Sequence, residues 1–299
     1  MGCSLSVKIS PEHLRTVHKD SHCRELTSSP LRGYRRRLSP NLLQGHLRNR
    51  IMSDASTSPM TPIVVRGKGG RKSVCSDGIE LGTKHAIVVG INRYAHWDWL
   101  ECPEQDATDV SACFQARKFN VVLLLGKNAT FRTIMRTLSS VSHTCETIVV
   151  SLHGHGVSGR NGASFLPQDA NDNPEDLSDK ITADFLKAWS RSWGGKHLLL
   201  LADCCFGGNF VMPSHSKMRG GGGKERVRMC ISGSTVGELI PDRAEGSTTH
   251  SDLTHALLKS TKRRQWNGSV LDMFVHIRRT AVNVKIGRLP GDEGGDMLL

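Results

Sequence analysis

The sequence predicts an α/β fold, in which a mostly parallel sheet is covered by helices on both faces. From Lys84 onward, short apolar runs rich in Val, Ile and Leu recur without alternating with polar residues. Runs of this kind are typical of strands that are buried on both faces of a parallel sheet. Longer mixed stretches separate the runs, so strand and helix alternate along the chain. This order favours right-handed crossovers that place helices on both faces of one sheet.

Five apolar runs and five mixed stretches give the elements that we expect. The expected strands are His85–Ile91, Asn120–Leu125, Thr147–Leu152, His197–Ala202 and Arg228–Ile231. The expected helices are Glu104–Arg117, Thr130–Val141, Thr182–Ser192, Ser251–Lys259 and Val270–Val282. A helix separates each of the first three strands from the next, which is the connection that parallel neighbours require.

Composition limits the class of protein. The chain has 299 residues, of which 37% are hydrophobic, and this is enough to bury the core of one domain. Its nine cysteines lack a repeated Cys-x-x-Cys spacing, and no apolar segment near the start indicates secretion. No apolar run approaches the roughly 20 residues that a membrane-spanning helix needs. We therefore expect a cytoplasmic protein with reduced thiols that does not cross a membrane.

Charge and composition divide the chain at about residue 82. The net charge of the whole chain is +12, and residues 1–82 contribute +8 of it through 14 Lys and Arg against 6 Asp and Glu. This segment is rich in Ser, Pro, Arg and Gly, and it buries too little apolar surface to offset its ordering entropy. We predict a disordered basic segment over 1–82, a folded domain over 83–290 and a C-terminal tail over 291–299. The basic segment favours an anionic surface as its partner, and without interleaved aromatic residues it does not indicate specific nucleic-acid binding.

The first six residues match a lipidation pattern. Met1-Gly2-Cys3-Ser4-Leu5-Ser6 has the Gly2 and Ser6 of the N-myristoylation motif, and Cys3 is suited to palmitoylation. One myristoyl chain holds a protein only weakly on a bilayer, with a partition constant of about 10⁴ per molar, so a second signal is needed. Palmitate on Cys3 or the basic runs would supply it. Unless Gly2 is a chance match, we expect peripheral attachment to the inner face of a membrane.

Two strand ends carry residues suited to acyl transfer. One expected strand ends in Ser151-Leu152-His153-Gly154-His155-Gly156, and another ends in Ala202-Asp203-Cys204-Cys205-Phe206-Gly207-Gly208. Because the carboxyl ends of parallel strands line one crevice, we expect the two motifs to meet. A thiol of pKa near 8.5 is only about 3% ionised at pH 7, so a His that accepts its proton gains at most about thirtyfold. Glycines let backbone N–H groups approach a substrate carbonyl, which is worth about a hundred- to thousandfold.

These motifs resemble those of a known family. A strand ending in His-Gly, followed about 50 residues later by Asp-x-Cys with Gly close behind, is similar to the caspase-like cysteine peptidases, and specifically to the metacaspases. The resemblance extends from Lys84 to about Arg279 and includes Ala86–Tyr94, Leu166-Pro167-Gln168-Asp169 and Ile231-Ser232. It implies a caspase-like three-layer sandwich and an endopeptidase that works through an acyl-enzyme.

The resemblance also implies roles for particular residues. Cys205 would be the nucleophile and His155 the general acid/base, with the N–H groups of Gly156 and Cys205 as the oxyanion hole. Metacaspases bind Lys or Arg through acidic pocket residues, and Asp203 and Asp106 match two of these. Two carboxylates in a pocket of low dielectric favour a cation strongly. We therefore expect protein or peptide substrates with Lys or Arg at the cleavage site.

The sequence departs from the family at several positions. His153, which we place in the substrate pocket, stands where the family usually has Ser, while Cys204 and Phe206 replace Ser and His. These departures leave open a catalytically inactive scaffold that keeps the fold and is tethered to a membrane. A zinc site built from His153, His155, Cys204 and Cys205 is another alternative. Cys204 is more simply explained as a core residue, because it points away from Cys205 if the strand persists.

Calcium binding and self-processing are two further expectations. The family's calcium site uses several Asp residues, of which Asp169 and Asp184 match here, whereas Ala183 and Met212 fall where carboxylates are expected. A hard cation needs many oxygen ligands, so calcium is only a candidate cofactor. The Gly-rich, basic stretch 217–228 is expected to be a mobile loop that the peptidase can cut in its own chain.

Overall fold

The computed structural model describes most of the chain beyond residue 82. The described residues are 64–65, 83–141, 143, 145–160, 162–211, 226–242, 244, 249–263, 266–281 and 283–299. The basic segment predicted over 1–82, with its lipidation motif, lies outside them apart from Val64–Val65. The predicted self-processing loop also lies outside them up to residue 225.

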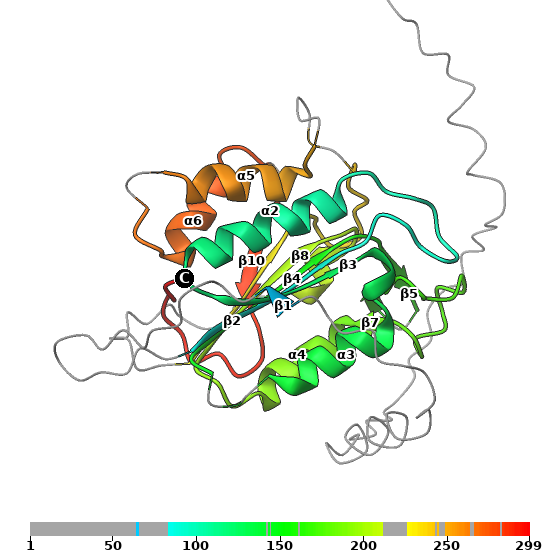
Figure 1. The fold of residues 1–299 in the computed structure, drawn as a ribbon, viewed down its shortest axis with the longest axis horizontal. Helices are drawn as coiled ribbons and strands as arrows, with labels where there is room; N and C mark the ends of the chain where they lie inside the picture. Colours follow the sequence, from blue (N-terminus) through cyan, green and yellow to red (C-terminus); the bar gives the residue numbers. More distant parts are fainter. Residues whose placement is uncertain are drawn as a thin grey trace, which may run out of the picture. The chain divides into compact units, whose positions relative to one another are not determined.

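A seven-stranded sheet forms the centre of the described domain (Figure 1). Its strand order is β1-β3-β2-β4-β8-β9-β10. Strands β3, β2, β4, β8 and β9 run parallel, while the edge strands β1 and β10 pair antiparallel with β3 and β9. The bounds are β1 Val64–Val65, β2 Lys84–Gly90, β3 Asn120–Leu125, β4 Thr147–His153, β8 His197–Asp203, β9 Val227–Ser232 and β10 Lys285–Arg288.

All five predicted strands are present, and all except the partly exposed β3 are mainly buried on both faces. Strand β4 is buried at every position, and β8 is buried at every position after its first residue. The observed bounds of these five strands differ from the predicted ones by at most one residue at either end. Apolar runs without polar alternation therefore identified the parallel sheet correctly.

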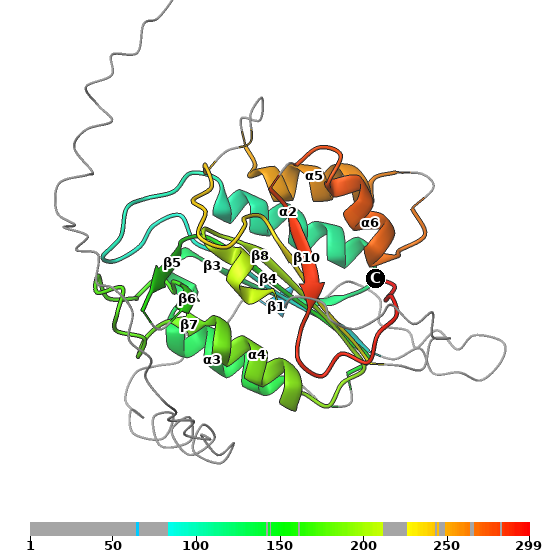
Figure 2. The same ribbon diagram turned by 180° about the vertical axis from the view of Figure 1, so that it is seen from behind.

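Helices cover both faces of the sheet, which confirms the predicted three-layer arrangement (Figures 1 and 2). One face carries α2 Pro103–Ala116, α5 Asp252–Thr261 and α6 Val270–Ile277, and the other carries α3 Phe131–Ser140 and α4 Ala183–Ser192. Two short 3-10 turns, η2 Gly126–Asn128 and η3 Gly207–Phe210, follow strands. Among the helices of the described residues, none has the length and apolar character that crossing a bilayer requires.

Side-chain hydroxyls define where four of these helices start. Thr130, Thr182, Ser251 and Ser269 each accept the backbone N–H three residues later. An N-cap of this kind typically contributes about 1 kcal/mol to stability. Helix α2 begins instead with Pro103, whose fixed φ suits a first helical turn.

A hydrophobic core lies between the sheet and helices α2, α5 and α6. Each helix presents one apolar face to it, because the buried residues recur every three or four positions. These residues are Ala107, Val110 and Phe114 of α2, Leu253, Ala256 and Leu257 of α5, and Val270, Met273 and Ile277 of α6. Fully burying a large apolar side chain contributes about 1.5–3 kcal/mol.

The structure differs from the predicted elements in three places. Helix α6 ends at Ile277 rather than at Val282, because the N–H groups of residues 279 and 280 bond three residues back and tighten the chain into turns. The predicted loop 217–228 ends early, since Val227 and Arg228 belong to β9. A second, antiparallel sheet contains strands too short for a periodic pattern to reveal. They are β5 Gly156–Gly159, β6 Gly162–Phe165 and β7 Ile181–Thr182.

The segment predicted as a tail, 291–299, packs against the start of α6. Met297 is 1% exposed and belongs to the hydrophobic core, and its carbonyl accepts the N–H of Val270 at 3.1 Å. Leu299 N–H donates to Gly268 O at 3.0 Å, while the side chain of Leu298 is 60% exposed. The buried side chain of Met297 and these backbone hydrogen bonds help to attach the segment to the domain.

We predict that Met297→Ala lowers the free energy of unfolding by at least about 2 kcal/mol, because truncation removes buried apolar surface and leaves a cavity. Leu298→Ala is the matched control, since its side chain is exposed and its loss should change stability by less than about 0.5 kcal/mol. Urea unfolding followed by tryptophan fluorescence measures both. Equal effects of the two substitutions would contradict a core role for Met297.

Candidate active site

The carboxyl ends of β4 and β8 bring the two sequence motifs together. The strands pair in parallel with His153 opposite Asp203, and Gly154 N–H donates to Asp203 O at 3.3 Å. His155 and Cys205 each follow two residues after this pair, in loops that leave the same edge of the sheet. The expectation that these two strand ends meet is confirmed.

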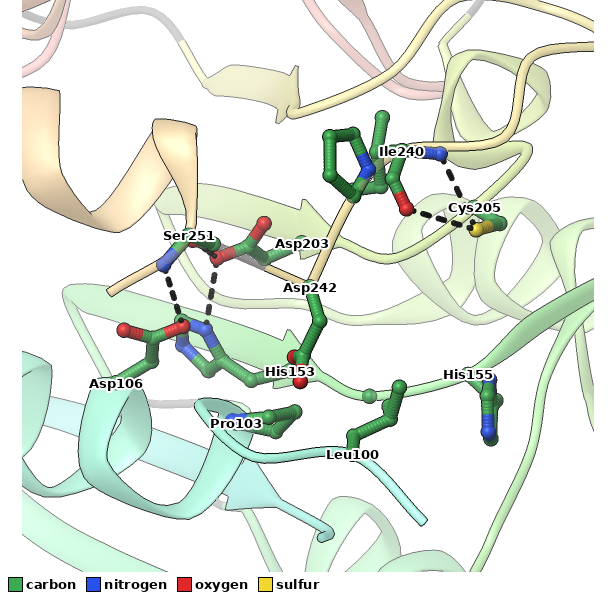
Figure 3. A pocket seen from close by; sticks show the side chains of 12 residues that line it. Leu100, Pro103, Asp106, His153, His155, Asp203, Cys205, Ile240, Asp242 and Ser251 are labelled. Atoms are coloured by element: carbon green, nitrogen blue, oxygen red, sulfur yellow. Dashed lines mark hydrogen bonds and ion pairs between the residues drawn. The ribbon is translucent and has the colours of Figure 1, made fainter. Parts of the chain in front are cut away.

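A pocket with a volume of about 40 Å³ lies between these loops (Figure 3). Five residues that the sequence analysis singled out line it, namely Asp106, His153, His155, Asp203 and Cys205. The remaining lining residues are Leu100, Pro103, Gly154, Ile240, Pro241, Asp242 and Ser251. The volume suits roughly three water molecules, at about 10–15 Å³ each.

Cys205 lies just beyond β8, after the fully buried Cys204. Phe206 adopts a left-handed conformation, with φ of 57°, and turns the chain sharply into η3. The half-buried sulfur of Cys205 accepts the N–H of Ile240 at 3.4 Å and lies 3.8 Å from Ile240 O. Burial raises the pKa of the Cys205 thiol, the Ile240 contact lowers it in part, and the charge of Asp203 raises it further. The thiol is therefore protonated at neutral pH in this conformation.

His155 is held on another wall of the pocket (Figure 3). Its Nε2 lies 2.8 Å from Asp98 O, and its ring packs 4.8 Å from the Tyr94 ring, centroid to centroid. Because a carbonyl oxygen only accepts, Nε2 carries a hydrogen, and Nδ1 is the nitrogen left to take a proton. Within the described residues, no hydrogen bond joins the imidazole to the sulfur of Cys205. The pair shares a pocket without being in contact.

Residues 238–242 form a segment that contacts the sulfur in place of His155. In its middle, the N–H and C=O groups of Ile240 both face Cys205 Sγ. At its end, the carboxylate of Asp242 accepts the N–H groups of residues 101 and 102. The segment thus links Cys205 to the chain that leads into α2, across the pocket opening.

The backbone of Gly156 approaches that of Cys205 closely. A Cβ on Gly156 would lie 2.0 Å from Cys205 O, so only glycine permits this approach. Among the described residues, the N–H of Cys205 has no hydrogen-bond acceptor. This approach involves the carbonyl group of Cys205, so the oxyanion hole formed by the two N–H groups stays a prediction.

Asp203 lies at the buried end of the pocket with its two oxygens in different surroundings. Oδ2 accepts the hydroxyls of Ser251 at 2.6 Å and Thr254 at 2.9 Å, and it lies 3.1 Å from His153 Nδ1. Oδ1 is buried and has no hydrogen-bond partner among the described residues. A buried carboxylate oxygen without a donor costs free energy that a cationic ligand can recover.

Asp106 reaches the same buried end from the first turn of α2. Its Oδ2 accepts Ser251 N–H at 3.2 Å, and its Oδ1 lies 2.8 Å from His250 Nδ1. Burial and the charge of Asp203 raise the pKa of Asp106 to about 7, although His153 and Ser251 oppose the rise. A protonated His250 would oppose it as well. The carboxyl of Asp106 therefore changes its charge near neutral pH.

His153 lies against the two acids rather than beside Cys205. Its Nδ1 pairs with Asp203, and its Nε2 lies 2.7 Å from Ser151 Oγ. Among the described residues, a close group of metal-ligand atoms joins Asp106, His153 and Asp203, all within 4.8 Å, and it includes neither His155 nor either cysteine. The predicted zinc alternative is therefore wrong, because His153 and His155 turn in different directions. Hydrogen bonds to each other and to Ser251 explain why Asp106, His153 and Asp203 lie close together.

The two calcium candidates lie at helix starts. Asp169 Oδ1 accepts the N–H of Phe131 at 2.7 Å, in the first turn of α3, and Asp184 is exposed in the first turn of α4. A carboxylate is stabilised there by the helix dipole. Within the part of the chain that the structure describes, neither Asp belongs to a cluster of three or more metal-ligand side chains.

The sequence analysis missed the residues that hold this site in place. Ser251 and Thr254 bind Asp203, Ile240 binds the candidate thiol, and Tyr94 accepts a backbone N–H at 2.8 Å from His155. None of them belongs to a motif. A Ser at a predicted helix start is a signal for an N-cap, but it does not reveal a carboxylate partner far away in the chain.

Comparisons with known proteins give one family match and a similar solved structure. The family model described as the caspase domain, Peptidase_C14, matches residues 83–288. Among the solved structures, protein GSU0716 from Geobacter sulfurreducens aligns with a TM-score of 0.53 and 19% sequence identity, covering 73% of this chain and 99% of that chain. At this identity the likeness concerns the fold alone. No curated protein matches the chain.

We predict that iodoacetamide alkylates Cys205 more slowly at pH 7 than it alkylates an ordinary thiol. Burial raises the pKa of Cys205, so its thiolate fraction lies below the roughly 3% of an unperturbed thiol at this pH. The rate should increase as the pH rises through and beyond the ordinary thiol pKa, since only the thiolate reacts. Mass spectrometry of the digested protein gives the rate at each pH.

His155→Ala provides the control for this reactivity. Because His155 does not contact the sulfur, its removal should leave the rate of alkylation unchanged when no substrate is present. A decrease of more than about threefold would mean that the two side chains already form a pair that activates the thiol.

Proposed function

The chain belongs to the caspase-domain family of cysteine peptidases, and from this premise we propose that it is an endopeptidase that cleaves after basic residues. The proposal rests on the residues that line one pocket. The candidate nucleophile Cys205 and the candidate base His155 line the same pocket as two buried carboxylates, Asp106 and Asp203. A nucleophile, a base and an acidic recognition site within one pocket are the parts that such a reaction needs.

In the proposed reaction, the thiol first leaves Ile240 and the imidazole leaves Asp98. Nδ1 of His155 takes the proton from Sγ, and the sulfur attacks the substrate carbonyl carbon while the N–H groups of Gly156 and Cys205 stabilise the oxyanion. His155 then gives its proton to the amine nitrogen, the C–N bond breaks and a thioester remains. Water attacks the thioester, its proton passes to His155, and the thiol is restored.

In the free protein, Cys205 and His155 each contact a backbone group, so activation of the thiol requires both side chains to move. In this proposal, the two groups approach each other by rotation about their own Cα–Cβ bonds, a motion that exposed side chains complete in picoseconds to nanoseconds. Until then, the sulfur remains bonded to Ile240 and protonated. In this proposal, binding of a peptide displaces the segment 238–242 from the sulfur, and the dyad forms only with substrate in place.

The acidic end of the pocket supports a basic side chain at the cleaved bond. Asp203 Oδ1 has no partner among the described residues, and Asp106 lies close enough to Asp203 for the two charges to interact. Two like charges in a site of low dielectric attract a cation and repel an acidic side chain. Preference for Lys or Arg, and not for Asp, is therefore part of the proposal.

Self-cleavage and membrane attachment also belong to the proposal, although they concern residues outside the described ones. The basic residues of the stretch 217–225 match the proposed pocket. Arg226, at the edge of this stretch, pairs with Glu293 at 2.7 Å and is a weaker candidate for the cut. Acylation at Gly2 and Cys3 would hold the domain at the inner face of a membrane.

We predict that the protein hydrolyses fluorogenic peptides that end in Lys or Arg at least about a hundredfold faster than the same peptides ending in Asp, because the pocket carboxylates repel an acid. Cys205→Ala should abolish this hydrolysis, since no nucleophile remains. Release of the fluorophore measures both rates. Mass spectrometry of the intact wild-type and variant chains detects self-cleavage within 217–225.

Each outcome of this comparison bears on one part of the proposal. Equal rates for wild type and Cys205→Ala would remove Cys205 from the mechanism and favour a scaffold without catalysis. Faster hydrolysis of the Asp peptides would contradict the acidic pocket. Self-cleavage that persists in Cys205→Ala would have to come from another protease.

We also predict that selectivity for Lys over norleucine, its uncharged analogue, increases with pH. Because burial raises the pKa of Asp106 to about 7, its carboxyl is neutral below this pH and attracts an ammonium above it. The ratio of kcat/KM for the two peptides should rise about tenfold between about pH 6 and 8, which corresponds to about 1.4 kcal/mol. The ratio cancels any titration of Cys205 and His155 that both substrates share.

Asp106→Asn is the control for this pH dependence. The amide preserves the shape of the side chain but cannot ionise, so most of the increase should be lost. An increase of the same size in the variant would assign the effect to another group that faces Asp106, namely Asp203, His153 or His250.

A further inference from the structure

The imidazole of His153 occupies the buried end of the pocket. Figure 3 shows the ring beside Asp106 and facing Asp203. The residue is 2% exposed, with Nδ1 at 3.1 Å from Asp203 Oδ2 and Nε2 at 2.7 Å from Ser151 Oγ. Because an ionised carboxylate only accepts, Nδ1 carries the hydrogen in its pair with Asp203. His153 thus fills the buried end of the pocket beside the two acids.

The two oxygens of Asp203 are consequently unequal as acceptors. Oδ2 already has three donors, from Ser251, Thr254 and His153, which saturates its lone pairs. Oδ1 is buried and has none among the described residues. A Cβ on Gly233 would lie 3.0 Å from Oδ1, so the backbone of Gly233 packs closely against this oxygen. One acceptor oxygen, and not two, remains for a ligand.

Lysine and arginine side chains differ in what they require of such a site. A guanidinium binds a carboxylate best through two parallel N–H···O bonds, one to each oxygen. An ammonium is a compact charge whose donors can rotate to use a single oxygen.

We propose that His153 determines substrate choice within this site by making the pocket select Lys over Arg at the cleaved bond. This inference rests on the peptidase activity proposed above. With His153 in place, a substrate ammonium binds Asp203 Oδ1 next to the charge of Asp106. Without the imidazole, the space of the ring becomes available, and a guanidinium can enter it beside Asp203 and Asp106.

The test uses two peptides that are identical except for Lys or Arg at the cleavage position. Wild type should give a kcat/KM at least about tenfold higher for the Lys peptide. His153→Ser should raise the ratio of kcat/KM for the Arg peptide to that for the Lys peptide at least about tenfold. A general loss of stability would lower both values together, so this unequal response separates specificity from folding.

Ser151→Ala is the matched control in the same network. It removes the hydroxyl that contacts Nε2 and leaves the imidazole next to Asp203, so the preference for Lys should persist. Loss of the preference in Ser151→Ala, with His153→Ser showing no gain for Arg, would contradict the role of the ring. So would a wild-type protein that prefers Arg.

A binding measurement decides the proposal without catalysis and without changing His153. The Cys205→Ala protein is titrated with butylammonium and with propylguanidinium, and the dissociation constants are measured by calorimetry or ligand-observed NMR. Butylammonium should bind at least about fivefold more tightly. Equal affinities, or tighter binding of propylguanidinium, would overturn the inference. If no peptide is cleaved but butylammonium is preferred, the proposed activity fails and the selectivity of the pocket stands.

Discussion

The parallel pairing of β4 with β8 is the constraint on which the candidate site depends. It places His153 opposite Asp203, and it starts the loops of His155 and Cys205 at the same edge of the sheet. A shift of one residue in this register would send the side chains of one strand to the opposite face. The buried acid and its imidazole partner would then separate, and the two loops would no longer enclose one pocket.

Burial explains why the candidate nucleophile is unionised in the free protein. A thiolate that is half-buried and close to Asp203 loses hydration and gains a repulsive charge, so its pKa rises. The neutral thiol instead bonds to the backbone of Ile240, and His155 bonds to Asp98 O. These contacts satisfy polar groups that would otherwise be unpaired. Under the proposed function, ionisation of Cys205 is coupled to the binding of a substrate that disrupts them.

The acidic end of the pocket follows from the same balance between burial and charge. Asp106 and Asp203 are both buried, and two adjacent carboxylates without partners would be costly. Hydroxyl groups and a backbone N–H from the start of α5, together with His153 and His250, supply donors to three of their four oxygens. The remaining oxygen, Asp203 Oδ1, has no donor among the described residues. A cation bound there would complete the hydrogen bonding of the two acids.

The sequence by itself determined the sheet, its layers and the residues at its functional edge. Burial on both faces produces apolar runs such as Thr147–His153, and strand polarity then brings the ends of parallel strands together. The short second sheet and the end of α6 were not predictable in this way, because neither produces a periodic pattern. Cys205, His155 and Asp203 line one pocket, as the shared edge of parallel strands implied, and so does Asp106, which only the family resemblance had placed there.

Only the tertiary structure decided how these side chains are paired. The sulfur of Cys205 bonds to Ile240, 35 residues away, and Asp106 meets His250 across 144 residues. His153 and His155 are separated by one glycine, yet one joins an acid and the other a backbone carbonyl. A hydrogen bond depends on distances of about 3 Å and on the direction of the donor, and no spacing along the chain encodes either quantity for segments that meet only after folding.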